Sequence, residues 1–107
     1  VPAPTPEEQA AAKLAKAKQE RAAAVSKIVV EVDGMKFDGD EEAQSRMSRT
    51  VATAIARGVD IKSETRTWVL ADNTIAHPTI DQLARATELA GNAMTKLWTK
   101  PYEGEKA

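Results

Sequence analysis

The chain has no cysteine, a single histidine and only two Trp, one Tyr and one Phe among its 107 residues. The lack of cysteine excludes disulfides, thiol chemistry and thiolate-bound zinc or iron–sulfur clusters, and one imidazole does not support a histidine-rich metal site. The 15 Lys and Arg residues nearly balance the 16 Asp and Glu residues, so no basic field attracts a nucleic-acid backbone. No apolar run approaches the roughly 20 residues that cross a bilayer. These absences predict one small soluble domain that binds neither nucleic acid nor membrane.

The beginning of the chain differs in composition from the rest. Alternating prolines in residues 1–6 favour an extended linker, because each proline fixes φ and removes an N–H donor. Thr5 is placed to cap a helix, and Glu8 occupies the position three residues later that completes a capping box. Residues 7–27 are mostly Ala, Lys, Glu and Gln, which are strong helix formers. We predict a Pro-rich linker over 1–6 and a helical arm over 7–27.

The predicted arm has only a weak apolar face. Ala10, Leu14, Ala17, Ala24 and Ile28 keep a rough spacing of three or four residues, but Arg21 interrupts the stripe. Two interpretations stay open: a solvated spacer helix, or a coiled coil that pairs with a partner or with copies of itself. The residues of this arm that we expect to bind a partner are Leu14, Ala17 and Val25.

From residue 28 the hydrophobic period changes from helical to two, which is typical of strands. Asp33-Gly34 separates two short alternating runs, and this dipeptide favours a two-residue primed turn. Such a turn pairs Val32 with Met35 and Val30 with Phe37, so that the large apolar side chains share one face. We predict a β-hairpin here.

The rest of the chain repeats the hairpin and follows each hairpin with a helix. Asp40 is placed to cap a helix that ends at Gly58, where glycine permits a left-handed conformation. A second hairpin is expected around Asp72-Asn73, and Thr79 is placed to cap a helix that ends before Pro101. We therefore predict an α+β fold, in which an extended N-terminal helix precedes two β-hairpin–helix units that form one small antiparallel sheet covered by two helices.

The domain is expected over residues 28–100, with a flexible tail over 101–107. The residues that we predict to be buried together in one cluster are Val30, Val32, Met35, Phe37, Met47, Val51, Ile55, Leu70, Leu83 and Met94. The second hairpin places Trp68, Leu70 and Ile75 on a common face, so Trp68 is assigned to the core. Trp98 lies beside Tyr102 near the helix end, and its role is left open between the core and a partner-binding surface.

The residues that could support chemistry are few. Five carboxylates lie between Asp33 and Glu42, but a calcium loop that starts at Asp33 or at Asp38 would have apolar residues at required positions. His77 precedes a proline and has no evident nucleophile to activate. We predict a protein that is not an enzyme and that has no metal site and no cofactor.

Two motifs resemble a known family. The first is Phe37-Asp38-Gly39-Asp40-Glu41 followed by Gln44, Arg46 and Met47, and the second is Thr67-Trp68-Val69-Leu70-Ala71-Asp72-Asn73-Thr74. They resemble a small C-terminal domain of unknown function found in tail-fibre assembly proteins and fibre-associated proteins of tailed bacteriophages. The resemblance covers about Ile28 to Trp98, and the linker and arm resemble the tether of such proteins. The connector over 59–66 is longer than the family usually shows.

The resemblance implies a non-enzymatic factor, similar to a chaperone, that binds a trimeric phage tail fibre in the host cytoplasm during assembly. The alternative is a structural component that stays in the virion tail, at the fibre or its tip, where it could contact the host surface. No site residues follow from the family, so Trp98 and Tyr102 join the three residues of the arm as the expected partner contacts. Self-association through the N-terminal helix is a further expectation.

Overall fold

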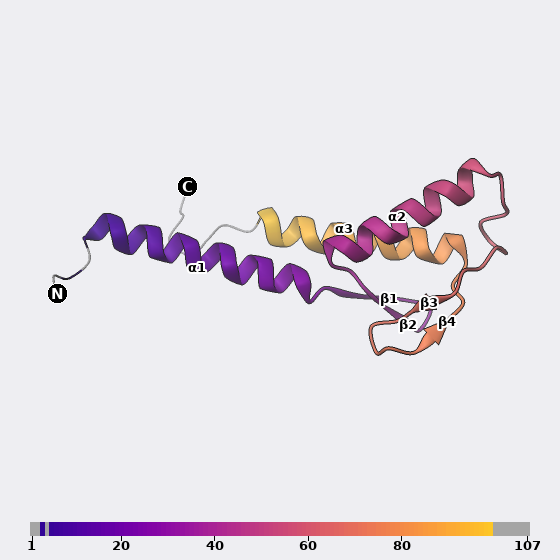
Figure 1. Cartoon of the computed structure of the whole chain (residues 1–107), viewed down its shortest axis with the longest axis horizontal. Helices are drawn as coiled ribbons and strands as arrows, with labels where there is room; N and C mark the ends of the chain where they lie inside the picture. Colours follow the sequence, from indigo (N-terminus) through magenta and orange to yellow (C-terminus); the bar gives the residue numbers. More distant parts are fainter. Residues whose placement is uncertain (1–2, 4, 100–107) are drawn as a thin grey trace.

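The computed structural model describes residue 3 and residues 5–99. Its elements, in chain order, are α1 (Pro6–Ser26), β1 (Val29–Val32), β2 (Met35–Asp38), α2 (Glu41–Ala56), β3 (Trp68–Val69), β4 (Ile75–Ala76) and α3 (Ile80–Thr99). This order confirms the α+β class and the two β-hairpin–helix units (Figure 1). Within the described part of the chain, no helix combines the length and the apolar character that crossing a membrane requires.

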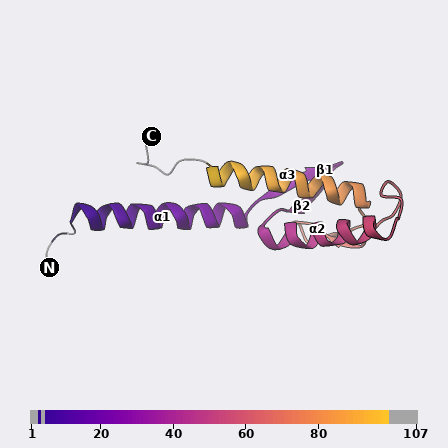
Figure 2. The same cartoon turned by 90° about the horizontal axis from the view of Figure 1, so that it is seen from above.

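Helix α1 extends well beyond the rest of the molecule (Figures 1 and 2). It begins as predicted, because the Thr5 hydroxyl oxygen accepts a hydrogen bond of 3.1 Å from the Glu8 N–H. The radius of gyration is 18.7 Å, whereas a compact chain of this length has about 13 Å. The difference reflects the projecting helix, whose C-terminal end packs against α3 through Val25.

The first hairpin has the predicted register. Val30 pairs with Phe37 and Val32 pairs with Met35. Asp33 and Gly34 have φ values of 49° and 82°, so both central residues of the turn adopt the left-handed conformation that a type I′ turn requires. Because of this register, the Phe37 side chain is completely buried.

The second hairpin forms a sheet of its own, so the predicted single sheet divides into two sheets of two strands each. Strands β3 and β4 have only two residues each, because the Leu70 N–H and the Thr74 carbonyl already close the turn between them at 2.8 Å. One backbone hydrogen bond of 2.9 Å, from the Ala71 N–H to the Lys36 carbonyl, connects the two hairpins. Side-chain packing under the helices therefore holds the hairpins together.

The register of the second hairpin corrects the expected position of Ile75. Trp68 pairs with Ala76 and Val69 pairs with Ile75. Ile75 consequently points away from the core and is exposed, while Ala76 takes the inward position beside Trp68. Trp68 is half-buried and packs against the core, as predicted.

The buried residues form two clusters instead of one. The first consists of Val32, Phe37, Met47, Ala54, Leu70, Ile80, Leu83 and Ala86, with Val30, Met35, Val51 and Trp68 among the partly buried side chains packed against it. The second consists of Val25, Ile28 and Ala90, with Val30, Ala93, Met94 and Leu97 packed against it. Met94 therefore belongs to the second cluster and is only partly buried. The last turn of α1 contributes to the folded body.

The prediction that Ile55 is buried is wrong, since this side chain is 59% exposed. Each residue of an α-helix turns the side chain by about 100°, so two steps of four residues from Met47 rotate Ile55 about 80° away from the buried stripe. Ala54 lies within about 20° of Met47 and occupies the buried position.

The caps predicted at Asp40, Gly58 and Thr79 of the domain helices are confirmed. The Asp40 carboxylate accepts the Ala43 N–H at 3.1 Å, and Gly58 follows α2 with a φ of 72°. At the start of α3, the Thr79 hydroxyl accepts the Gln82 N–H, and the Gln82 side chain accepts the Thr79 N–H. This reciprocal arrangement is a capping box and fixes where α3 begins.

The turn of the first hairpin is attached to α3 through Asp33. Its carboxylate accepts hydrogen bonds from Arg85 at 2.7 Å and from Gln82 at 3.1 Å. The bond from Arg85, with a smaller contribution from Gln82, lowers the pKa of Asp33 below its ordinary value of 3.8. The charged carboxylate is thus favoured in the folded state.

We expect the Asp33–Arg85 contact to contribute stability that is present above pH 3.8 and lost as the pH falls through the lowered pKa of Asp33. Asp33→Asn keeps a side chain that tolerates positive φ but removes the charge. Urea unfolding of both proteins, at neutral pH and in acid, should show that the wild type loses more stability in acid than the variant does. Equal losses would contradict this linkage.

Candidate functional site

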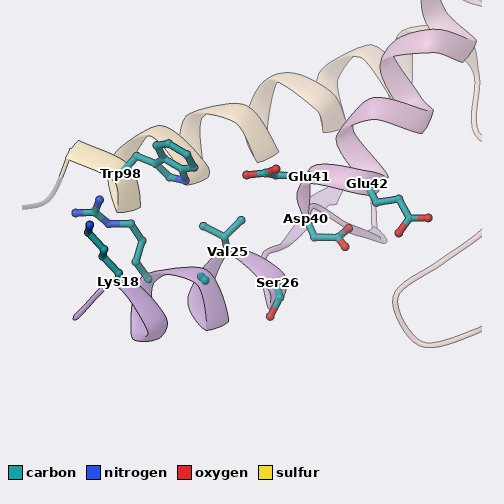
Figure 3. A pocket seen from close by; sticks show the side chains of 9 residues that line it. Lys18, Val25, Ser26, Asp40, Glu41, Glu42 and Trp98 are labelled. Atoms are coloured by element: carbon teal, nitrogen blue, oxygen red, sulfur yellow. The ribbon is translucent and has the colours of Figure 1, made fainter. Parts of the chain in front are cut away.

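An open groove of about 480 Å³ lies where three helix ends meet (Figure 3). The C-terminal half of α1 forms one wall, the start of α2 forms another, and Trp98 near the end of α3 closes the third side. Its lining residues are Lys18, Arg21, Ala22, Val25, Ser26, Asp40, Glu41, Glu42 and Trp98. The groove is thus built from segments that are far apart in the sequence.

The two long walls of the groove carry opposite charge. Lys18 and Arg21 lie on the α1 wall, whereas Glu41 lies at the start of α2 and points toward the groove (Figure 3). The neighbouring Glu42 points away from the groove and forms an ion pair of 2.8 Å with Arg46. These acidic residues follow the Asp40 cap, where the positive end of the α2 dipole favours them. Trp98 contributes an exposed aromatic surface to the third side, with 56% of the residue accessible to solvent.

The structure brings only some of the predicted partner contacts together. Val25 and Trp98 both line the groove, but Val25 is only 7% exposed and packs mainly within its own chain. Leu14 lies nearer the N-terminus of α1, outside the groove, with 37% of its surface exposed. Ala17 is half-buried. Tyr102 lies outside the described residues.

Sequence reasoning missed the charged residues of the groove. Lys18, Arg21 and Val25 follow Leu14 at steps of four, three and four residues, so helical spacing places them on the same stripe as Leu14. That spacing could have identified the basic wall. Its position opposite Glu41 depends on how α1 meets α2, which local patterns do not reveal.

A smaller hollow of about 250 Å³ lies near the second hairpin. Trp68 and Val69 of β3 form one side, and Asp38 and Arg46 contribute side chains of opposite charge. Of the described residues, no group of three or more His, Asp or Glu side chains is arranged to hold a metal ion. His77 is exposed.

We expect calcium or zinc at millimolar concentration to leave the melting temperature of the chain unchanged. Asp38, Asp40, Glu41 and Glu42 act at a turn and a helix start, and the described residues include no set of ligands arranged to bind a cation in the folded state. Thermal unfolding followed by circular dichroism, with and without each ion, measures the effect. A saturable rise in melting temperature would contradict the assignment of these acids to turn and cap.

Comparison with known proteins places the chain in a family without an assigned role. The model of the family described as a domain of unknown function, DUF4376, matches residues 8–100, so the chain belongs to this family. The match includes most of α1 together with the two hairpin–helix units. Neither the curated proteins nor the solved structures include a significant match to the chain.

Proposed function

We propose that the chain is a non-enzymatic binding module that helps a phage tail fibre to assemble, with α1 as the arm that contacts the fibre. The observation that carries this proposal is the projecting helix. Residues 6–16 of α1 are all exposed, and the long axis of the molecule measures 64 Å against 28 and 20 Å for the others. A rod attached to a small body is suited to contacting an elongated partner along its length.

The two sequence motifs that resemble the phage family also have structural roles consistent with a rigid support for the arm. The first motif contains Phe37, the Asp40 cap and Met47, and the second contains Trp68 and Leu70. All of these residues hold the folded body together. Their resemblance to tail-fibre assembly domains therefore supports a shared scaffold, while α1 and the groove supply the surfaces that bind.

The proposal is tested by producing a trimeric phage tail-fibre protein with and without the chain. We expect the chain to co-purify with the fibre and to raise the yield of soluble trimeric fibre. Leu14→Glu should weaken co-purification, because it places a charge on the exposed stripe of α1. Ala12→Glu is the matched control, since Ala12 is exposed on the opposite side of the same helix.

The structural alternative is that the chain stays in the virion tail. The protein composition of purified particles distinguishes it from the role of an assembly factor. A chain present in fixed proportion to the fibre would be a structural component, whereas a chain that raises fibre yield but is absent from particles is an assembly factor. A fibre that trimerises equally well without the chain, and does not bind it, would contradict both roles.

A further inference from the structure

The stripe of α1 that runs through Leu14 is exposed at Glu7 and Leu14 and partly buried at Arg21, and it is complementary to itself under a two-fold rotation. Leu14 lies near the middle of the helix, with Glu7 seven residues before it and Arg21 seven residues after it. Seven residues make almost two complete turns, so these three side chains lie within about 20° of one another around the helix axis. The stripe therefore has an acidic end, an apolar centre and a basic end.

From this geometry we infer that α1 binds α1 of a second copy of the chain in antiparallel orientation, with the two Leu14 side chains meeting on the two-fold axis. In this register Glu7 of each copy faces Arg21 of the other, and Ala10 faces Lys18. Ala11 faces Ala17, so small side chains allow the two backbones to approach closely. An isologous interface uses the same surface on both copies, so this surface must be complementary to itself. The stripe meets this requirement, because each end pairs with the oppositely charged end of the other copy.

The arrangement of α3 supports the antiparallel orientation. Helix α3 runs in the opposite direction to α1 and ends beside the last turns of α1, so that most of α1 continues past the end of α3 (Figures 1 and 2). An α1 helix of a second copy that packs antiparallel to α1 would run in the same direction as α3 and begin near the C-terminal end of α3. The negative end of the α3 dipole would then face the positive end of the incoming helix.

The groove provides space for the start of the incoming helix. Trp98 marks the end of α3, and Lys18 and Arg21 line the same groove on α1. Glu7 of the second copy would enter at this basic wall. The apolar stripe is also continuous with the second core cluster, because Val25 lies eleven residues after Leu14 and therefore within about 20° of it.

The size of the contact predicts a weak dimer. The overlap of about 15 residues is about 22 Å long, and a helix is about 10 Å wide, so each copy contributes a footprint of about 220 Å². This footprint is well below the about 800 Å² per partner of a standard interface. Association should therefore depend on protein concentration and weaken as salt screens the exposed charge pairs.

Disulfide cross-linking of the full chain tests the register, because the sequence has no native cysteine. We expect Ala10→Cys mixed with Lys18→Cys to give a covalent dimer. Ala10→Cys alone should cross-link poorly, since two such residues would lie about 12 Å apart along an antiparallel pair and a disulfide requires Cα atoms within about 7 Å. Efficient cross-linking of Ala10→Cys alone would indicate a parallel pair and would overturn the inference.

A charge exchange tests the Glu7–Arg21 contacts by sedimentation equilibrium. Glu7→Arg alone and Arg21→Glu alone should each weaken dimerisation about tenfold, whereas an equimolar mixture of the two variants should restore it, because the heterodimer regains both pairs. Ala12→Glu, on the opposite side of α1, is the control that should dimerise like the wild type. Circular dichroism confirms that each variant is folded.

The result is decisive in either direction. A wild-type chain that stays monomeric at all concentrations, or that forms trimers, would overturn the inference. A mixture that associates no better than either single variant would do so as well. The test uses the purified chain without a fibre, so it is independent of the proposed function.

Discussion

Phe37→Ala should destabilise the domain by about 3 to 5 kcal/mol, a large part of the total stability of so small a fold. The Phe37 side chain is completely buried in the first core cluster, between the hairpin and the two helices that cover it. Its loss would leave a cavity that the short strands cannot close, because the register of β1 and β2 is fixed by the Asp33-Gly34 turn. Urea unfolding followed by circular dichroism measures the change.

Ile55→Ala is the matched control, since it also shortens a large apolar side chain. Ile55 is exposed, so we expect a change within about 0.5 kcal/mol. The sequence pattern predicts that both side chains are buried, but only Phe37 is buried in the structure. The two variants therefore show whether stability follows the sequence pattern or the observed packing. A change below about 1 kcal/mol for Phe37→Ala, or a loss of several kcal/mol for Ile55→Ala, would contradict the core described here.

The comparison of sequence and structure shows which features are local. The first hairpin was predictable because Asp33-Gly34 tolerates positive φ, and one register alone places Val30, Val32 and Phe37 on the same face. The helix starts were predictable for a similar reason, because a capping side chain contacts a backbone group only three residues away.

Features that depend on distant contacts were not predictable to the same degree. The short strands around Asp72-Asn73 leave too few alternating residues to fix a register, so the sequence pattern places Ile75 on the wrong face. The groove joins Lys18, Glu41 and Trp98 from three helices, and no local pattern places them together. The sequence identified Trp98 as a candidate contact, and helical spacing could place Lys18 and Arg21 on one face of α1, but no local pattern places that face opposite Glu41.

Gly39→Ala is the second substitution for which we expect a large effect, about 3 kcal/mol of destabilisation. Gly39 is buried between the end of β2 and α3, and its N–H donates to the Ile28 carbonyl at 2.7 Å. A Cβ atom at this position would lie 2.6 Å from Ile28 Cγ2 and 2.9 Å from Ala90 Cβ. Ala90 is fixed in a helix, so relief of the overlap requires α3 or the strand to move.

Gly91→Ala is the control for Gly39→Ala, because a Cβ atom at Gly91 would meet only the Gln44 Oε1 atom at 3.9 Å. Gly91 lies inside α3, so this variant should gain up to about 1 kcal/mol from helix propensity.

Ile28→Ala removes the nearer of the two overlapping atoms, so the cost of Gly39→Ala should be smaller in the Ile28→Ala background. Denaturant unfolding of the four proteins of this cycle measures the coupling. Two outcomes would contradict this role of Gly39: additive effects of the two substitutions, or a loss of only about 0.5 kcal/mol in the free energy of unfolding for Gly39→Ala. Either would show that the chain can shift at this contact and that packing of the hairpin against α3 does not need a glycine here.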